Sequence, residues 1–217
     1  MKRSEKANIA HKILNRIYKK VPIPLTHRNK FELVVAVLLS AQCTDERVNQ
    51  VTPILFKKAN TAKKMINIPK NTIYKIIRPC GLAPQKSKAI YELSRILVKK
   101  FKGKVPESFE ELEKLPGVGH KTASVVMSQG FGHPAFPVDT HIHRLAQRWG
   151  LTNGKNVVQT EKDLKFLFPK KSWNKLHLQI IFYGREYCQA RYCYGLECEI
   201  CKSCNPKRSK PIKTKKP

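Results

Sequence analysis

The chain has 217 residues, of which 41% are apolar, and its 43 lysine and arginine residues outnumber 15 acidic residues to give a net charge of +28. This length and apolar content suffice to bury a core, which excludes a wholly disordered protein. The charge would repel itself strongly unless a polyanion lay nearby, so it favours binding of DNA or RNA. Because lysine is much commoner than arginine, a generally basic proteome would also explain part of the excess.

No segment has the composition of a signal peptide or of a membrane span. Residues 1–10 are polar and charged, and the most apolar run, residues 31–39, contains Glu32 and is far too short to cross a bilayer. The sequence therefore predicts a soluble, cytoplasmic and nucleoid-associated protein that does not bind membranes.

Apolar residues recur at spacings of three and four along nearly the whole chain, which is typical of helices. Residues 31–41 are apolar on most faces, so this helix is expected at the centre of a helical domain. No run alternates with the period of a strand, and the predicted fold is all-α. The expected helices run from a Ser4 cap to Pro22 and over residues 31–41, 45–56, 85–101, 108–115, 121–128, 139–149, 156–168 and 173–183, with shorter segments between residues 60 and 79.

The segment Leu115-Pro-Gly-Val-Gly-His-Lys-Thr-Ala123 combines a glycine turn with the start of a helix. Gly117 and Gly119 permit a turn whose backbone N–H groups point outward, and the helix dipole adds to them, so that one phosphate is bound without any sequence readout. The segment resembles the helix-hairpin-helix motif that binds the DNA backbone. A glycine-rich connection without a ligand is the alternative, which the adjacent lysine and the charge of +28 disfavour.

Three segments together resemble one enzyme family. Leu-Leu-Ser-Ala-Gln-Cys-Thr-Asp (38–45), the hairpin segment (115–123) and Val-Asp-Thr-His-Ile-His-Arg (138–144) look like endonuclease III, a family of base-excision repair enzymes. The resemblance extends from about Lys30 to Cys204, in the family's order and spacing. It implies a bifunctional glycosylase that removes oxidised pyrimidines and cleaves the abasic site. The implied partner is double-stranded DNA with damaged pyrimidines or abasic sites, and we expect a monomer.

The family's architecture implies two helical lobes with a DNA-binding cleft between them. Residues 23–133 would form the lobe that contains the hairpin, and residues 1–22 would pack with residues 134–204 in the other. The tail, residues 205–217, carries six lysine or arginine residues and three prolines, and it is predicted to be disordered.

The resemblance makes Lys121 the nucleophile and Asp139 its carboxylate partner. A primary amine can attack the sugar C1′ and then form an imine, so a lysine suits both base removal and β-elimination. Asp139 would help to activate the amine and would stabilise positive charge on the sugar. The alternatives are a lysine that only contacts phosphate and an aspartate that only caps the next helix.

The remaining DNA-binding positions also follow from the resemblance. Gln42 and Leu82 match the positions that fill the gap left by an extruded base, with helix capping and ordinary packing as their respective alternatives. The sequence after Leu82, Ala-Pro-Gln-Lys-Ser-Lys, indicates a longer loop than usual. His141 and His143 should point in different directions on one helix and so form no metal pair. The expected DNA-binding residues of the hairpin segment are Gly117, Val118, Gly119, His120 and Thr122.

Five of the seven cysteines lie within residues 188–204, which in a reducing compartment favours a metal or iron–sulfur site over disulfides. The family holds a [4Fe–4S] cluster through the pattern Cys-x6-Cys-x2-Cys-x5-Cys. In ungapped register Cys188, Cys198 and Cys204 fall on the first, third and fourth ligand positions, whereas the second is Gly195.

Cys201 or Cys193 would supply the missing ligand. The two-residue spacings favour Cys201, because they let neighbouring thiolates converge, and the expected ligands are therefore Cys188, Cys198, Cys201 and Cys204. A zinc ion bound by the same thiolates and an empty loop are the alternatives to an iron–sulfur cluster.

Two other functions remain open at this point. A monofunctional glycosylase of the mismatch-adenine type has the same fold, but that type lacks a lysine at position 121 and usually carries a further domain after the cluster. A non-catalytic helix-hairpin-helix protein would explain the charge and the hairpin, but it would leave the pairing of Lys121 with Asp139 as a coincidence.

Overall fold

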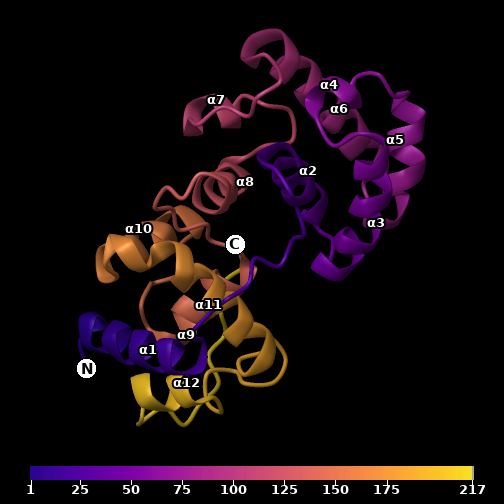
Figure 1. The fold of residues 1–217 in the computed structure, drawn as a ribbon. Coiled ribbons are helices and arrows are strands. Elements are labelled where there is room, and N and C mark those ends of the chain that lie inside the picture. Colours follow the sequence, from indigo (N-terminus) through magenta and orange to yellow (C-terminus); the bar gives the residue numbers. More distant parts are fainter. Residues whose placement is uncertain (217) are drawn as a thin grey trace. The chain divides into compact units, whose positions relative to one another are not determined.

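The computed structural model describes residues 1–216, and within them it contains helices and no strand. This result confirms the all-α prediction. The chain divides into two compact units, one made of residues 23–133 and the other of residues 1–22 together with the chain from residue 134 onward (Figure 1). None of the helices in the described part of the chain combines the length and the apolar character needed to cross a bilayer.

The unit of residues 23–133 is built around helix α2 (Lys30–Ser40), in which nine of eleven residues are buried. Asn29 caps this helix by accepting the N–H of Glu32 at 2.9 Å, and the Glu32 carboxylate accepts the N–H of Arg28 at 2.7 Å. Helices α3 and α8 pack on α2, while α4 and α5 pack on α6 (Figure 1). The other elements of this unit are α3 (Asp45–Lys58), α4 (Ala62–Met65), α5 (Lys70–Ile77), the 3₁₀ helix η1 (Arg78–Cys80), α6 (Ala83–Phe101), α7 (Phe109–Glu113), α8 (His120–Val125) and the π-helical turn η2 (Val126–Gly130).

Several helix starts differ by one or two residues from the sequence-based expectation, among them those of α6, α8 and α1. Helix α6 begins at Ala83, directly after Leu82, so no long loop follows Leu82. Pro84 lies in the first turn of α6, where its missing N–H costs no hydrogen bond and its fixed φ suits a helix. Helix α8 begins at His120, one residue earlier than expected, and α1 is capped at Lys2 and not at Ser4.

The second unit combines the first helix with the last ones. Helix α9 packs on α10, α11 and α12, and α1 packs on α11 and α12. Trp149 and Tyr183 are fully buried and meet edge to face, with ring centroids 5.8 Å apart. Gln179 fixes the end of α1 by donating to the Tyr18 carbonyl at 2.9 Å. The elements of this unit are α1 (Arg3–Ile17), α9 (Thr140–Trp149), α10 (Val157–Leu167), the 3₁₀ helix η3 (Lys170–Ser172), α11 (Trp173–Glu186) and α12 (Glu199–Cys204).

The basic tail packs on this second unit over residues 205–216, which differs from the disorder that its composition predicts. Its backbone and the Arg208 side chain find hydrogen-bond partners on α9 and on the cysteine loop, and charge and proline content alone do not reveal such partners. Three of these bonds join Arg208 Nη1 to the Gly195 carbonyl at 3.1 Å, the Ile212 N–H to the Tyr194 carbonyl at 3.0 Å, and the Lys215 N–H to Gln147 Oε1 at 2.8 Å.

Candidate active site and nucleic-acid interface

The hairpin between α7 and α8 requires glycine at position 117. The φ of Gly117 is +78°, a conformation that glycine adopts without strain. A Cβ atom on this residue would lie 2.7 Å from Leu38 Cδ1 and 3.0 Å from Ala89 Cβ, so the turn packs directly on α2 and α6. Gly119, which caps α8 with a φ of −92°, has open space where a Cβ would be. Gly117 therefore shapes the turn, whereas Gly119 leaves room in front of the helix.

We expect Gly117→Ala to lower the free energy of unfolding by about 1–3 kcal/mol, because the added methyl group meets two packed side chains and the backbone is strained. Gly119→Ala is the matched control, and its expected change is below about 1 kcal/mol. Urea denaturation of both variants measures the difference. Equal denaturation midpoints for the two variants would contradict this account of the turn.

Val118 and His120 are held by the hairpin itself. Val118 is 4% exposed and its N–H donates to the Leu115 carbonyl at 3.0 Å, so this N–H is used within the hairpin. A contact of Val118 with DNA stays a prediction. The ring of His120 stacks on Phe109, and its Nδ1 lies 2.8 Å from Glu113 Oε1. The first N–H groups of a helix have no partner within it, so the backbone amides of Lys121 and Thr122 in the first turn of α8 can donate to an anion.

Lys121 is the second residue of α8, and its side chain is exposed, whereas Thr122 is half-buried. Side chains on a helix tilt toward its N-terminus. The amine of Lys121 therefore extends toward the same end of α8 as the backbone amides of the first turn. This geometry places a primary amine at the N-terminal turn of α8, within one unit of the protein.

Asp139 caps helix α9. Its Oδ1 accepts the N–H of Ile142 at 2.8 Å, and the residue is half-buried. The capping role that the sequence allowed is thus confirmed. Because this hydrogen bond uses one carboxylate oxygen, the second oxygen remains for another partner.

The two histidines of the Val-Asp-Thr-His-Ile-His segment face different neighbours, as expected. His143 is buried, its Nδ1 lies 2.8 Å from Thr160 Oγ1, and burial lowers its pKa. His141 Nδ1 lies 3.3 Å from a guanidinium nitrogen of Arg144. The pair therefore forms no metal site with each other.

Gln42 and Leu82 share an unusual conformation. Both are exposed and lie in the left-handed region of the backbone, with φ of 55° and 49°. Gln42 follows the end of α2, and Leu82 follows η1 and Gly81. A left-handed residue with a side chain costs roughly 1–2 kcal/mol, and such strain is found at sites that contact ligands. Two strained, exposed residues after two helix ends fit a surface that meets DNA.

The four sulfur atoms of Cys188, Cys193, Cys198 and Cys201 lie within 4.8 Å of one another, and all four residues are buried. Cys204, which the two-residue spacing favoured, is not in this group and its Sγ donates to the Lys6 carbonyl at 3.5 Å. Cys198 caps α12 and Cys204 ends it, so a rise of six residue steps places them about 9 Å apart along the helix axis. Cys193 takes the place of Cys204 in the group.

Gly195, at the family's second ligand position, has no room for a side chain. Its φ is +87°, and a Cβ would lie 2.6 Å from Ile212 Cγ2 and 2.8 Å from Arg208 Nη1. The packed tail therefore covers this position. A sulfur donor is available two residues earlier, at Cys193.

The chemistry of the cysteine group suits a soft metal. Arg148 is 2% exposed, and its Nη1 donates to Cys188 Sγ at 3.3 Å, which places a positive charge beside the sulfurs. Four thiolates bind zinc or an iron–sulfur cluster. The sulfur of Cys201 lies 3.9 Å from that of Cys188 and 3.8 Å from that of Cys193. Tetrahedral coordination of one zinc ion by bonds of about 2.3 Å gives sulfur separations of roughly 3.8 Å. The same four converging thiols also supply the four cysteine ligands that a [4Fe–4S] cluster requires.

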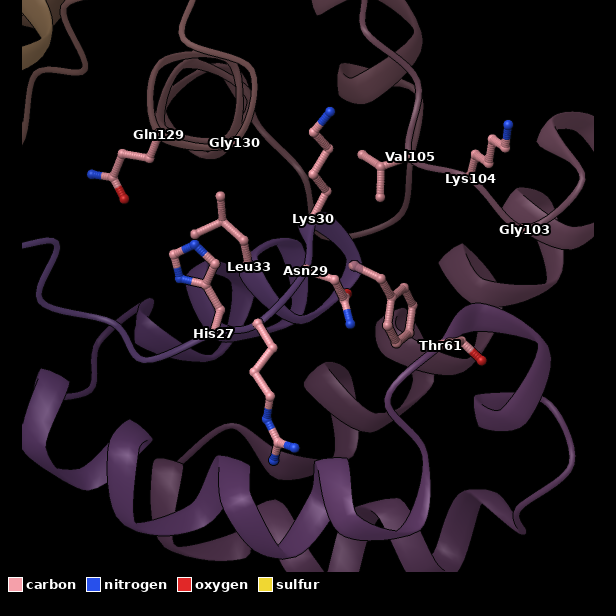
Figure 2. A pocket seen from close by; sticks show the side chains of 12 residues that line it. His27, Asn29, Lys30, Leu33, Thr61, Gly103, Lys104, Val105, Gln129 and Gly130 are labelled. Atoms are coloured by element: carbon pink, nitrogen blue, oxygen red, sulfur yellow. The ribbon is translucent and has the colours of Figure 1, made fainter.

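A cavity of about 630 Å³ lies in the unit of residues 23–133, at the start of α2. Figure 2 shows the side chains of Lys30 and Lys104 beside it, and Phe31 and Val105 form part of its wall. None of the residues that the sequence singled out for DNA binding or catalysis lines this cavity.

Comparison with known proteins identifies the family. A family model described as the HhH-GPD superfamily of base excision DNA repair proteins matches residues 35–170. Endonuclease III of Bacillus subtilis is 44% identical over 181 residues, which cover 83% of each chain. The chain belongs to the endonuclease III family. Endonuclease III of Synechocystis is 40% identical over 193 residues, covering 88% of both chains.

Solved structures agree with this family assignment. A non-covalent endonuclease III–DNA complex matches with a TM-score of 0.86 and 38% identity, over 95% of this chain and all of that one. A trapped covalent endonuclease III–DNA intermediate also matches with a TM-score of 0.86 and 38% identity, over 94% and 98% of the two chains. The family is one of base-excision DNA glycosylases, so the alternative of a non-catalytic DNA-binding protein is disfavoured.

Proposed function

We propose that this chain, acting as a monomer on nucleoid DNA, excises oxidised pyrimidines and then cleaves the abasic site by β-elimination. The observation that carries the proposal is the exposed Lys121 in the first turn of α8, directly after the phosphate-binding hairpin, in a member of the endonuclease III family. A phosphate bound by the hairpin would hold the neighbouring sugar within reach of the Lys121 amine.

Lys121 would carry both chemical steps. Its neutral amine attacks C1′ of the extruded nucleoside, and the bond from C1′ to the base breaks as the base leaves with a proton. The nitrogen lone pair then expels the ring oxygen O4′ from C1′, and a proton moves from nitrogen to O4′, which opens the sugar ring and gives an imine between Nζ and C1′. The imine acidifies C2′, so that removal of a C2′ proton expels the 3′ phosphate and nicks the strand. Water then hydrolyses the imine and frees the lysine.

Asp139 would serve this reaction from the N-terminus of α9. The carboxylate would accept a proton from the lysine ammonium and stabilise positive charge on the sugar. One oxygen would keep its hydrogen bond to the Ile142 N–H, which holds the carboxylate in one orientation.

Gln42 and Leu82 would fill the space that the extruded base leaves. Both side chains are exposed on strained backbone at helix ends, which suits residues that enter a duplex. Removing a base from the stack costs a few kcal/mol, and contacts from inserted side chains would offset part of that cost.

The cysteine group would hold a [4Fe–4S] cluster, as in the family that the sequence resembles, and it would stabilise the loop of residues 188–201. A bound cluster would supply structural cross-linking of four thiolates and no step of the base excision. Zinc is the second candidate, because the sulfur separations of 3.8 and 3.9 Å fit one ion. Visible absorbance with iron, sulfide and zinc analysis of the purified protein separates the two.

The ligand set gives a direct test by cysteine substitution. We expect Cys193→Ser to lose most of the bound metal and Cys204→Ser to retain it, because only Cys193 lies in the group of four. Metal content per chain, measured by elemental analysis, is the readout, and thermal stability should fall only in the first variant. If Cys193→Ser kept its metal and Cys204→Ser lost it, the ligands would be those expected from the sequence, with Cys204 in place of Cys193.

The proposed function is tested by borohydride trapping of the unmodified protein on two duplexes, one with thymine glycol and one with an abasic site. Covalent adducts on both duplexes support the proposal, because borohydride reduces an imine to a stable bond. Base release without an adduct would support a monofunctional glycosylase. Binding without either product would leave only a DNA-binding protein.

A further inference from the structure

A buried lysine joins the two segments that end in Gln42 and Leu82. Lys86, in the first turn of α6, is 5% exposed. Its Nζ donates three hydrogen bonds to backbone carbonyls, to Leu39 at 2.8 Å, to Ala41 at 2.8 Å and to Cys80 at 2.9 Å. An ammonium group has three donors and no acceptor, so all of its hydrogen-bonding capacity is used here.

The three carbonyls belong to two different helix ends. Leu39 and Ala41 lie at the C-terminus of α2, and Cys80 is the last residue of η1. Carbonyls at a helix C-terminus lack partners within the helix and carry partial negative charge, which an ammonium group satisfies. In addition, the backbone N–H of Lys86 donates to the Leu82 carbonyl at 2.9 Å. Lys86 thus fixes the backbone at Ala41, directly before Gln42, and at Leu82 itself.

Stability of the fold alone does not explain a charged side chain at position 86. Burial lowers the pKa of Lys86, whereas the neighbouring thiols of Cys43 and Cys80 raise it. Burying a charge is expensive, and apolar residues of similar size often stabilise a fold as well or better. A buried charge that spans two strained segments is therefore better explained by the geometry that it imposes on them.

We propose that Lys86 is a positioning residue that holds Gln42 and Leu82 at a fixed separation and in their left-handed conformations, so that both enter the duplex when a base is extruded. This inference rests on the gap-filling role in the proposed function. Lys86 contacts neither DNA nor the reacting sugar in this account. It acts through the carbonyls that it binds.

The expected effect differs between two substrates. Extruding thymine glycol costs stacking energy, whereas an abasic site has no base to extrude. Loss of Lys86 should therefore slow excision of thymine glycol by at least tenfold relative to β-elimination at a preformed abasic site. A residue that only stabilises the fold would lower both rates equally or neither.

The experiment compares Lys86→Met with Lys88→Met, a control that removes an exposed lysine two residues further along the same helix. Single-turnover rates are measured on both duplexes, at a temperature where circular dichroism shows the variants folded. The ratio of excision to elimination should fall in Lys86→Met and stay at the wild-type value in Lys88→Met. An unchanged ratio in Lys86→Met overturns the inference.

Two further measurements keep the test decisive. If Lys86→Met does not fold, Lys86→Arg takes its place in the test. Arginine keeps the charge but cannot place a single nitrogen among the three carbonyls. We therefore expect the ratio of excision to elimination to fall in Lys86→Arg, by less than in Lys86→Met. A wild-type ratio in Lys86→Arg overturns the inference in that case.

Fluorescence of 2-aminopurine opposite a non-cleavable abasic analogue reports insertion of the Gln42 and Leu82 side chains into the duplex without any chemical step. Failure of the wild-type protein to form an imine adduct would sink the proposed function, whereas unchanged fluorescence in the folded Lys86 variant would sink the positioning role alone.

Discussion

Replacing Lys121 by alanine is expected to abolish the borohydride-trapped adduct and to slow strand cleavage at an abasic site by about 10³-fold or more, because the variant has no amine at this position to form the imine. Base release from thymine glycol should fall with it, since the same amine attacks C1′. The affinity for the duplex should change little, because the backbone amides of the first turn of α8 remain. Gel mobility of the complex measures this affinity.

The control for Lys121 is Lys114→Ala, which removes another exposed lysine of the same hairpin. Lys114 is paired with Glu110 and Glu111, so its role is local. At saturating protein the adduct should form in this variant as in the wild type. An adduct that survives in Lys121→Ala would show that another amine forms the imine, and the assignment of the nucleophile would be lost.

The helical fold and the hairpin could be predicted from the sequence because each depends on local patterns. The buried helix α2 follows from a run of apolar residues, and the turn at Gly117 follows from glycine spacing. Asp139 was recognisable as a helix cap from its position before residues 140–149. Each of these features is determined by residues close together in the chain, so each can be predicted from the sequence.

The errors concern contacts between distant segments. The sequence left Cys193 and Cys201 as alternatives beside Cys204, whereas the structure groups both of them and leaves out Cys204. That outcome depends on how the turn of residues 188–198 folds back on α12, which two-residue spacing does not reveal. The ordered tail depends on partners at Gln147 and Tyr194. Lys86 carried no signal in the sequence, because a lysine among 43 basic residues is expected to be solvated. Burial of a lysine is visible only in three dimensions.

The role of Asp139 can be separated from capping by two substitutions. Asparagine is as good a cap as aspartate, so Asp139→Asn should keep the hydrogen bond to the Ile142 N–H and the thermal stability of the wild type. Its loss of charge should lower the rate of base excision by about 10²–10⁴-fold if the carboxylate acts in proton transfer and charge stabilisation. Asp139→Ala should lose both the helix cap and the catalytic carboxylate, and its free energy of unfolding should fall by about 1 kcal/mol.

Single-turnover excision rates and thermal unfolding of the two variants decide between the roles. Asn156→Ala is the matched control, because Asn156 caps α10 by the same type of bond, to the Gln159 N–H at 2.8 Å. That variant should lose stability and keep the excision rate. A wild-type rate in Asp139→Asn would leave Asp139 as a cap alone, and the proton transfer assigned to it would require another group. A slow but stable Asp139→Asn requires that the negative charge itself acts on the sugar or on the amine, because the cap is the same in both proteins.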